Sequence, residues 1–147
     1  MKKLAFSFLF SMACCMAMAQ SLLPSEKTLA NKEKKLILLN FSGSDWCIPC
    51  IKMQKEYFEN ADFKSMADSQ LVIVRADFPR KKKNMPSPEM VKRNEQLAER
   101  FNQNGSFPLT LLLDEELNIL KKWDGLPEIT AAEFSKDIST IVKQHTR

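Results

Sequence analysis

The sequence predicts one α/β domain, in which a mixed four-stranded sheet is flanked by helices. Two apolar runs of strand length, 36–41 and 71–74, are separated by a segment whose apolar residues recur at helical spacing. Two strands joined by a helix are expected to pair in parallel through a right-handed crossover. Farther along, a short acidic turn separates the apolar stretches 109–113 and 117–123, which predicts an antiparallel hairpin. The predicted order of elements is β-α-β-α-β-β-α.

The composition agrees with a globular domain that has a core of its own. The chain has 147 residues, of which 44% are hydrophobic and 27% are charged. These are ordinary values for a soluble domain. After residue 19, no apolar run is long enough to span a membrane.

The first nineteen residues have the pattern of a secretory signal peptide. Lys2 and Lys3 precede an uncharged, mostly apolar stretch over 4–18. The sequence Ala-Met-Ala, which ends at Ala19, then places small residues at the two positions that a signal peptidase recognises. We therefore expect cleavage between Ala19 and Gln20 and a periplasmic or secreted protein.

Cleavage there would remove two of the four cysteines, Cys14 and Cys15, together with two lysines. The chain would keep only Cys47 and Cys50, which excludes a scaffold of several disulfides. The formal net charge would fall from +4 to +2, which favours no polyanionic partner such as nucleic acid. Two alternatives for the N-terminus are a short membrane anchor and a lipoprotein attached through one of the two early cysteines, although Ser-Met-Ala before them lacks the usual leucine.

The segment before the first strand, 20–35, is polar and rich in lysine. A helix could begin at Ser25, but its apolar face is thin, so the segment is either a leader or a marginal helix. The domain proper is expected to extend over 36–147. Its first strand has an unbroken apolar run, which predicts burial on both faces, and Gly43 allows the loop after it to turn sharply.

A helix is predicted to begin at Ile48 and to break near Asn60. A short second piece restarts at Asp62 and carries further apolar residues. The second strand follows as a buried apolar run that begins at Leu71 and ends at Asp77.

The loop after the second strand, 78–87, contains a basic run from Arg80 to Lys83. The simplest interpretation is a solvated loop, and the alternative is that the run steers acidic partners or lowers the pKa of a nearby thiol. Ser87 and Pro88 then provide the cap and the first residue of a helix, which Asn104-Gly105 is expected to end. The residues of its inner face are Met90, Val91, Asn94, Leu97, Ala98 and Phe101.

The last helix has a clear start signal. Thr130 and Glu133 have the spacing of a capping box, and they follow a predicted loop over 124–129. The residues expected to face the core are Phe134, Ile138, Ile141 and Val142.

Cys47 and Cys50 stand two residues apart, where the first strand ends and the next helix begins. The unpaired N–H groups of a helix N-terminus favour a thiolate, which is the nucleophile of disulfide exchange. Pro49 is compatible with a first helical turn. The pattern indicates dithiol–disulfide chemistry, with Cys47, nearer to solvent, as the attacking thiol and Cys50, on the apolar helix face, as the resolving thiol. Trp46 would shield the pair.

Two other interpretations of these cysteines are weaker. A purely structural disulfide would close so small a loop that it would stabilise the fold little. Half of a zinc site would need two further ligands, and the chain after residue 19 offers only His145 and carboxylates.

The motif Trp46-Cys47-Ile48-Pro49-Cys50, followed by Lys52, resembles the active site of the thioredoxin family. Phe107-Pro108 resembles that family's cis-proline loop. The Ser-Gly-Ser-Asp sequence before the motif is most similar to exported bacterial thioredoxin-like proteins, and the resemblance extends over residues 33–145. It implies a thioredoxin-like fold, without that family's extra first strand, and an enzyme that needs no metal or organic cofactor.

The resemblance also implies that Trp46, Pro49, Phe107 and Pro108 bind the substrate. A cis bond before Pro108 would turn the backbone of Phe107 toward a bound peptide. The two parallel strands end, and an antiparallel third strand begins, at the same edge of the sheet. This edge would bring together the cysteine pair, the loop 78–87 and Phe107-Pro108.

One position departs from the family's pattern. Thioredoxins place a buried aspartate behind the cysteine pair as proton acceptor for the resolving thiol, and Asn40 occupies about that place here. An amide cannot take a proton, so either water or another group takes it, or turnover is slower. Asp45 is closer in sequence but is expected to face solvent.

These expectations describe a disulfide reductase of the cell envelope. The dipeptide Ile48-Pro49 contains no histidine and resembles the Gly-Pro of reducing thioredoxins, which predicts a reducing potential. The expected partners are disulfide-containing protein substrates and a membrane thiol-reductase as electron donor, and the protein is expected to be a monomer. The alternative from another class is a thioredoxin-fold metallochaperone that binds a soft metal through the two thiolates.

Overall fold

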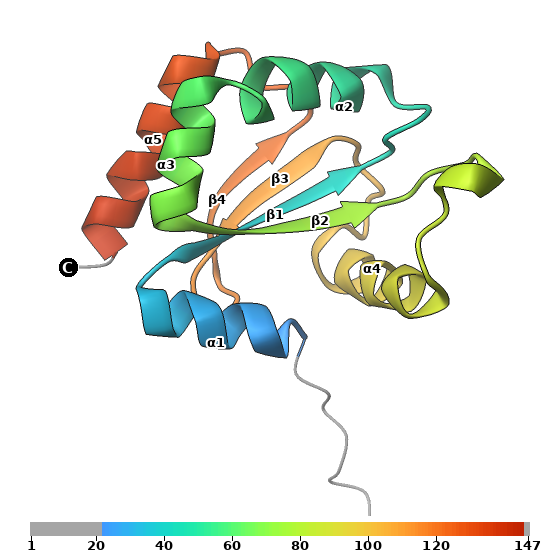
Figure 1. Ribbon diagram of the computed structural model, residues 1–147, viewed down its shortest axis with the longest axis horizontal. Helices are drawn as coiled ribbons and strands as arrows, with labels where there is room; N and C mark the ends of the chain where they lie inside the picture. The colour runs from blue at the N-terminus through green and yellow to red at the C-terminus, as the bar shows by residue number, and fades with distance from the viewer. Residues whose placement is uncertain (1–21, 146–147) are drawn as a thin grey trace, which may run out of the picture.

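Figure 1 shows the computed structural model, which describes residues 22–145. The elements are α1 (Pro24–Glu33), β1 (Leu36–Ser42), α2 (Ile48–Met53), the π-helical turn η1 (Gln54–Phe58), α3 (Ala61–Gln70), β2 (Leu71–Asp77), the 3-10 turn η2 (Lys82–Asn84), α4 (Pro88–Phe101), β3 (Leu109–Leu113), β4 (Ile119–Asp124) and α5 (Ala131–His145). The predicted signal peptide, 1–19, lies outside the described residues. Within 22–145, no helix has the length and hydrophobicity needed to cross a membrane.

The four strands form one mixed sheet in the order β2-β1-β3-β4. β1 is parallel to β2 and antiparallel to β3, and β3 is antiparallel to β4. This arrangement confirms the predicted mixed sheet and its final hairpin. Because β1 is a central strand, its residues 36–41 are all buried, as their apolar pattern predicts.

Helices cover both faces of the sheet, with α1 and α4 on one side and α2, α3 and α5 on the other (Figure 1). Side chains of β1 alternate between the two sides. One set packs in a core with Ala30 of α1 and Leu97 of α4. The other set packs in a second core with Met53 of α2, Phe63 of α3 and Phe134 of α5. The strand that leads to the cysteines is therefore held between two cores.

Local signals place the helix starts where they are predicted. Asn60 caps α3 by accepting a hydrogen bond at 2.9 Å from an N–H of its first turn. Ser87 caps α4 in the same way at 3.3 Å. Thr130 and Glu133 form the capping box before α5, because each donates its backbone N–H to the side chain of the other, at 2.8 and 3.2 Å.

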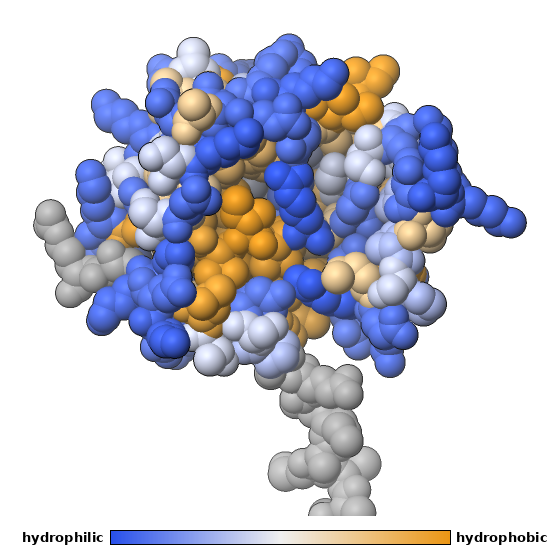
Figure 2. Space-filling view, in the orientation of Figure 1, coloured by the Kyte–Doolittle hydropathy of each residue, from blue (hydrophilic) through white to orange (hydrophobic). Residues whose placement is uncertain are grey.

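β2 is less buried than its sequence predicts. It is an edge strand, and Ile73 is 42% exposed. Figure 2 shows a hydrophobic patch over this part of the sheet. The prediction of burial over 71–74 is therefore wrong at this position, because an apolar run does not reveal whether the strand lies inside the sheet or at its edge.

The segment before β1 forms the helix α1, which was one of the two alternatives for it. Two apolar side chains attach it to the sheet, Leu23 at 3% exposure and Ala30 at 1%. The thin apolar face is thus sufficient for packing.

α4 ends earlier than Asn104-Gly105, the stop that its sequence predicts. Its last residue is Phe101, and the side chain of Asn102 then bonds both backbone groups of Ser106 at 2.8 and 2.9 Å. Gly105 has a φ of 64° inside that turn, a conformation that favours glycine. The Asn-Gly signal therefore marks the turn and not the helix end.

Candidate active site

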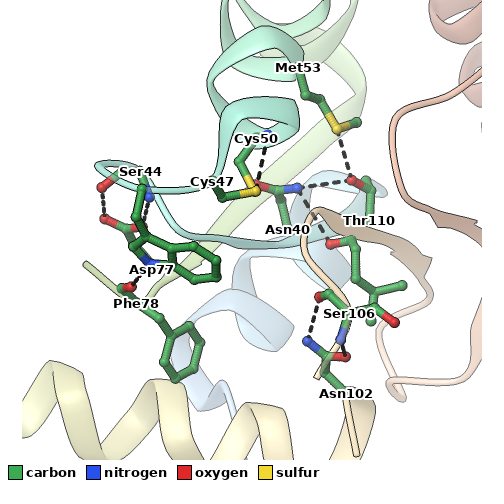
Figure 3. Close-up of a disulfide and its surroundings, with 12 residues drawn as sticks. Asn40, Ser44, Cys47, Cys50, Met53, Asp77, Phe78, Asn102, Ser106 and Thr110 are labelled. Atoms are coloured by element: carbon green, nitrogen blue, oxygen red, sulfur yellow. Dashed lines mark hydrogen bonds between the residues drawn. A yellow bond between two sulfur atoms is a disulfide. The ribbon is translucent and has the colours of Figure 1, made fainter. Parts of the chain in front are cut away.

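The two cysteines lie at the junction of β1 and α2 and are joined in a disulfide with an S–S distance of 2.09 Å (Figure 3). Cys47 is the N-cap of α2, and Pro49 lies in the first helical turn. The Sγ atom of Cys47 accepts a hydrogen bond from the backbone N–H of Cys50 at 3.2 Å. After reduction, a thiolate at Cys47 would keep this donor and the positive end of the helix beside it.

The disulfide is covered, whereas the dipeptide inside it is exposed. Cys47 is 4% exposed and Cys50 is 3% exposed, so the expected solvent-side position of Cys47 is not seen in the oxidised pair. Ile48 is 78% exposed, the highest fraction among the exposed large hydrophobic residues of 22–145, and Pro49 is exposed as well. Ile48 and Pro49 can therefore contact another molecule that approaches the disulfide.

Trp46 joins three segments beside the disulfide. Its indole N–H donates a hydrogen bond to the carbonyl of Phe78 at 2.8 Å. Its ring meets the ring of Phe107 edge-on, with centroids 5.5 Å apart, and Phe107 packs edge-on against the Phe78 ring at 5.6 Å. The loops after β1 and β2 and the start of β3 thus meet at one place, as the predicted topology requires.

Gly43 is required for a reason other than the expected sharp turn. A Cβ atom at this position would lie 2.3 Å from Cε2 of Trp46, well inside contact distance. Its backbone, unlike that of Gly105 and Gly125, is not in the left-handed region. The missing side chain therefore makes room for the indole.

The Phe107–Pro108 peptide bond is cis, as the resemblance implies. It directly precedes β3, whose Leu109 pairs with Phe41 near the end of β1. The Pro108 carbonyl accepts a hydrogen bond from the N–H of Gly125 at 2.8 Å. Within the described residues, the backbone N–H and C=O of Phe107 make no hydrogen bond, so both remain available to an extended peptide.

Asn40 lies behind the disulfide, where the resemblance places it (Figure 3). It is 4% exposed, and its amide donates hydrogen bonds to Thr110 Oγ1 at 2.9 Å and to the Leu109 carbonyl at 3.4 Å. Thr110 Oγ1 in turn lies 3.6 Å from Sδ of Met53. The side chains drawn behind the pair in this network are thus an amide, a hydroxyl and a thioether, none of which takes up a proton near neutral pH.

Asp45 was expected to face solvent, but its carboxylate is bonded to the loop after β2. Its carboxylate accepts three hydrogen bonds of 2.9 Å, from the backbone N–H groups of Arg80 and Lys81 and from the side chain of Asn84. These bonds, that of Arg80 first, hold the pKa of Asp45 below its usual value, against an opposing effect of burial. Asp45 therefore fastens the loop after β2 to the loop that carries the cysteines.

A second contact reinforces this attachment. The carboxylate of Asp77, at the end of β2, accepts hydrogen bonds from the backbone N–H of Ser44 at 2.9 Å and from its hydroxyl at 2.5 Å. Figure 3 shows the pair beside the disulfide. The loop before Cys47 is thus tied to β2 as well as to the segment beyond it.

Residues 18–114 match a family model described as thioredoxin-like. The chain belongs to the thioredoxin-like family. Two curated relatives of Chlamydia pneumoniae are similar to it, a disulfide bond reductase named DsbH, 36% identical over 107 residues, and a thioredoxin-related protein named DsbJ, 34% identical over 115 residues. The matches cover 73% and 77% of this chain but only 63% and 32% of those relatives, less than two thirds of the length of either.

Solved structures show the same thioredoxin-like fold. The DsbH oxidoreductase has a TM-score of 0.72 and 30% identity, over 80% of this chain and 79% of that one. A disulphide isomerase from Xylella fastidiosa has a TM-score of 0.53 at 15% identity, over 97% of this chain and 100% of that one. A poplar thioredoxin h has a TM-score of 0.51 at 19% identity, over 80% and 86%. At such identities the last two establish the fold alone.

In this thioredoxin-like domain, the residues predicted for the site come together: the cysteine pair, Trp46, Pro49, Phe107, Pro108 and Asn40. The exposure of Ile48 was not predicted, and the only signal for it is its place between the two cysteines in a first helical turn. The two carboxylate anchors were not predicted either, because no local pattern encodes them. Among residues 22–145 there is no group of three His, Cys, Asp or Glu side chains that could hold a metal ion. The DsbH relative is named a disulfide bond reductase and an oxidoreductase, which favours disulfide exchange over the metallochaperone alternative.

Proposed function

We propose that this protein is a thiol–disulfide oxidoreductase of the cell envelope, which reduces disulfides in other proteins. The observation that carries the proposal is the Cys47–Cys50 pair at the start of a helix, beside the free backbone of Phe107. The match to the thioredoxin-like family and the name of the DsbH relative support the same chemistry.

Reduction of a substrate proceeds in two exchange steps. The thiolate of Cys47 attacks one sulfur of the substrate disulfide, the substrate S–S bond breaks, and the departing sulfur takes up a proton. Cys50 then loses its proton and attacks Sγ of Cys47, which restores the Cys47–Cys50 disulfide and releases the second substrate sulfur as a thiol. In total, two electrons and two protons pass from the dithiol to the substrate.

The assignment of roles rests on the cap of α2. In the reduced pair, Cys47 is the better thiolate because its Sγ lies at the helix start and faces the N–H of Cys50. Cys50 resolves the mixed disulfide because it stays within bonding reach of Cys47. Asn40 cannot accept the Cys50 proton, which therefore goes to water or to another group.

The substrate chain lies between the exposed Pro49 and the Phe107–Pro108 segment. The N–H and C=O of Phe107 pair with an extended stretch of that chain in β-like fashion. Trp46 forms one wall, held in place by Phe78 and by the Phe107 ring.

The N-terminal sequence supports export. Residues 1–19 act as a signal peptide that is cleaved after Ala19, so the domain works in the periplasm or outside the cell. A reductant in an oxidising compartment consumes its dithiol, so a membrane thiol-reductase supplies it with electrons. The protein acts on protein disulfides as a monomer.

Trapping of the mixed disulfide tests this function. The reduced Cys50→Ser variant is incubated with a purified disulfide-bonded protein and examined on a non-reducing gel. We expect a covalent adduct that dithiothreitol releases. The Cys47→Ser variant is the matched control and should form little adduct. If both variants trap the substrate equally, or neither does, the proposed roles are wrong.

A further inference from the structure

The loop after β2 places four consecutive cationic residues, 80–83, at the same end of the molecule as the disulfide. All four are exposed. Figure 1 shows the loop with η2 at the right-hand end, where the chain also passes from β1 into α2. Figure 2 shows a hydrophilic projection at this end. The exchange chemistry described above makes no use of these charges.

The loop is fixed to the cysteine loop. Asp45 accepts hydrogen bonds from the backbone N–H groups of Arg80 and Lys81, both at 2.9 Å. The carboxylate bonds the backbone and forms no ion pair with the cationic side chains, although it attracts the charge of Lys81. Within 22–145, none of the ion pairs involves residues 80–83. The loop therefore presents its charges in a set position.

Arg80 connects these charges to the active site. Its guanidinium carbon lies 4.0 Å from the centroid of the Trp46 ring, and Trp46 directly precedes Cys47. A guanidinium that stacks on a ring keeps its N–H edges free, and these edges match the geometry of a carboxylate. A carboxylate bound to Arg80 would thus belong to a chain that lies at the disulfide.

Nearby carboxylates offset only part of this charge. Asp45 and Asp77 keep their negative charges while they accept hydrogen bonds from backbone and hydroxyl groups of the two loops, and Asp45 also attracts the charge of Lys81. On α2, Lys52 adds a further exposed cation, and Glu56 lies 3.9 Å from its ammonium group, a weak surface contact. The five cations, residues 80–83 and Lys52, outnumber these three carboxylates, so the balance of charge around the site is positive, although the net charge of the chain is small.

We propose that the basic loop, residues 78–84, recognises an acidic segment of the substrate protein, in which Asp or Glu residues flank the cysteine to be reduced. This inference rests on the proposed function and names the substrate class for it. Opposite charges raise the rate of encounter and orient the approaching chain, whereas a basic segment is repelled. Arg80 binds a carboxylate beside Trp46, and Lys81, Lys82 and Lys83 extend the attraction along the chain.

A matched set of peptide disulfides tests the inference. Each peptide carries one cysteine in a disulfide with the same small thiol, and its flanking residues are acidic, neutral or basic. The rate at which each oxidises the reduced protein is measured at low ionic strength and again at high salt. We expect the acidic peptide to react about tenfold faster than the neutral one, the basic peptide to react more slowly than both, and salt to narrow these differences.

Two charge-matched variants locate the effect. The loop variant replaces Lys81, Lys82 and Lys83 by Gln and leaves Arg80 on Trp46. The control variant replaces three exposed lysines of α1, α3 and α5 by Gln, namely Lys32, Lys64 and Lys143. We expect the acidic-to-neutral rate ratio to fall at least threefold in the loop variant and to stay unchanged in the control. Flanking charges can also change the reactivity of the peptide disulfide itself. This effect cancels when the acidic-to-neutral rate ratio is compared between the two variants, because both react with the same peptides.

Two results would overturn the acidic-substrate proposal while the proposed function stands. In both, the neutral peptide oxidises the two variants at normal rates. In the first, the acidic peptide reacts no faster than the neutral one, and in the second it reacts faster by the same factor in the loop variant as in the control. If no peptide oxidises the protein, the proposed function fails and the inference fails with it. If the loop variant alters only binding to phosphatidylglycerol vesicles or to single-stranded DNA, the loop serves a membrane surface or a nucleic acid, and the proposal is overturned.

Discussion

The backbone N–H of Cys50 points at Sγ of Cys47, 3.2 Å away, across the first turn of α2. In the reduced protein the same N–H and the helix start would stabilise a thiolate at Cys47. We predict that iodoacetamide alkylates the Cys50→Ser variant with a midpoint well below pH 8.5, the approximate value of a free cysteine. The rate of alkylation against pH measures it. A midpoint at the ordinary cysteine value would show that the helix start has no such effect.

Gly43 and Trp46 form a close contact that leaves no room for a side chain. We predict that Gly43→Ala lowers the free energy of unfolding by about 1–3 kcal/mol and slows disulfide reduction, because the indole must move. Urea denaturation and an activity assay measure the two effects. In a Trp46→Ala background the same Gly43→Ala change should lower the free energy of unfolding much less. An equal decrease in the two backgrounds would mean that the indole is not the obstacle.

Asp45 should make stability depend on pH. Its pKa is lowered in the folded protein, chiefly by the N–H of Arg80, so the carboxylate stabilises the fold above the unfolded value of about 3.9, and this contribution is lost as the pH falls through the lower folded value. We predict that Asp45→Asn is less stable than the wild type at neutral pH, because an amide cannot accept all three bonds. The difference in stability between the variant and the wild type should narrow as the pH falls below about 4.

The control for this prediction is Asp68→Asn, a change of the same kind at an exposed position of α3. Its stability should follow that of the wild type across the same pH range in urea denaturation. If Asp45→Asn is less stable than the wild type by the same amount at every pH, the loss comes from the changed hydrogen bonds and not from the missing charge.

Asn40 stands where a carboxylate would accept the proton of Cys50. We predict that Asn40→Asp accelerates the step in which Cys50 resolves the mixed disulfide, by about tenfold or more, because it adds a general base. It should also cost about 1–3 kcal/mol of stability, because a carboxyl group loses water when buried. Stopped-flow kinetics of mixed-disulfide decay and urea denaturation measure both.

Thr110→Val provides the comparison for Asn40→Asp. It removes the hydroxyl that Asn40 bonds at 2.9 Å and adds no base, so it should lower stability without faster resolution. If both variants resolve the mixed disulfide at the wild-type rate, proton transfer from Cys50 does not limit that step.

The sequence was most informative where the signal is local. The apolar run of β1, the capping box before α5 and the cysteine pair between a strand and a helix all predicted what the structure contains. The family resemblance added the cis bond before Pro108 and the position of Asn40.

Features that depend on the packed fold could not be predicted in this way. The exposure of Ile73 follows from the place of β2 at the sheet edge. The bonds of Asp45 to Arg80 and Lys81 join residues 35 and 36 positions apart, and no spacing pattern encodes such a pair. The burial of Cys47 in the oxidised pair likewise comes from the arrangement of the loops around it.

The most direct test of the central claim is the redox equilibrium of the Cys47–Cys50 pair. The purified protein is equilibrated with glutathione buffers of graded potential, and the free thiols are trapped and counted. Because Ile48-Pro49 adds no histidine to stabilise the thiolate further, we predict a potential nearer to about −270 mV, as in thioredoxin, than to about −120 mV, as in a strong periplasmic oxidant. The pair should thus be a disulfide in all but strongly reducing buffers. A pair that stays reduced in buffers near −120 mV would make the protein an oxidant and would contradict the account.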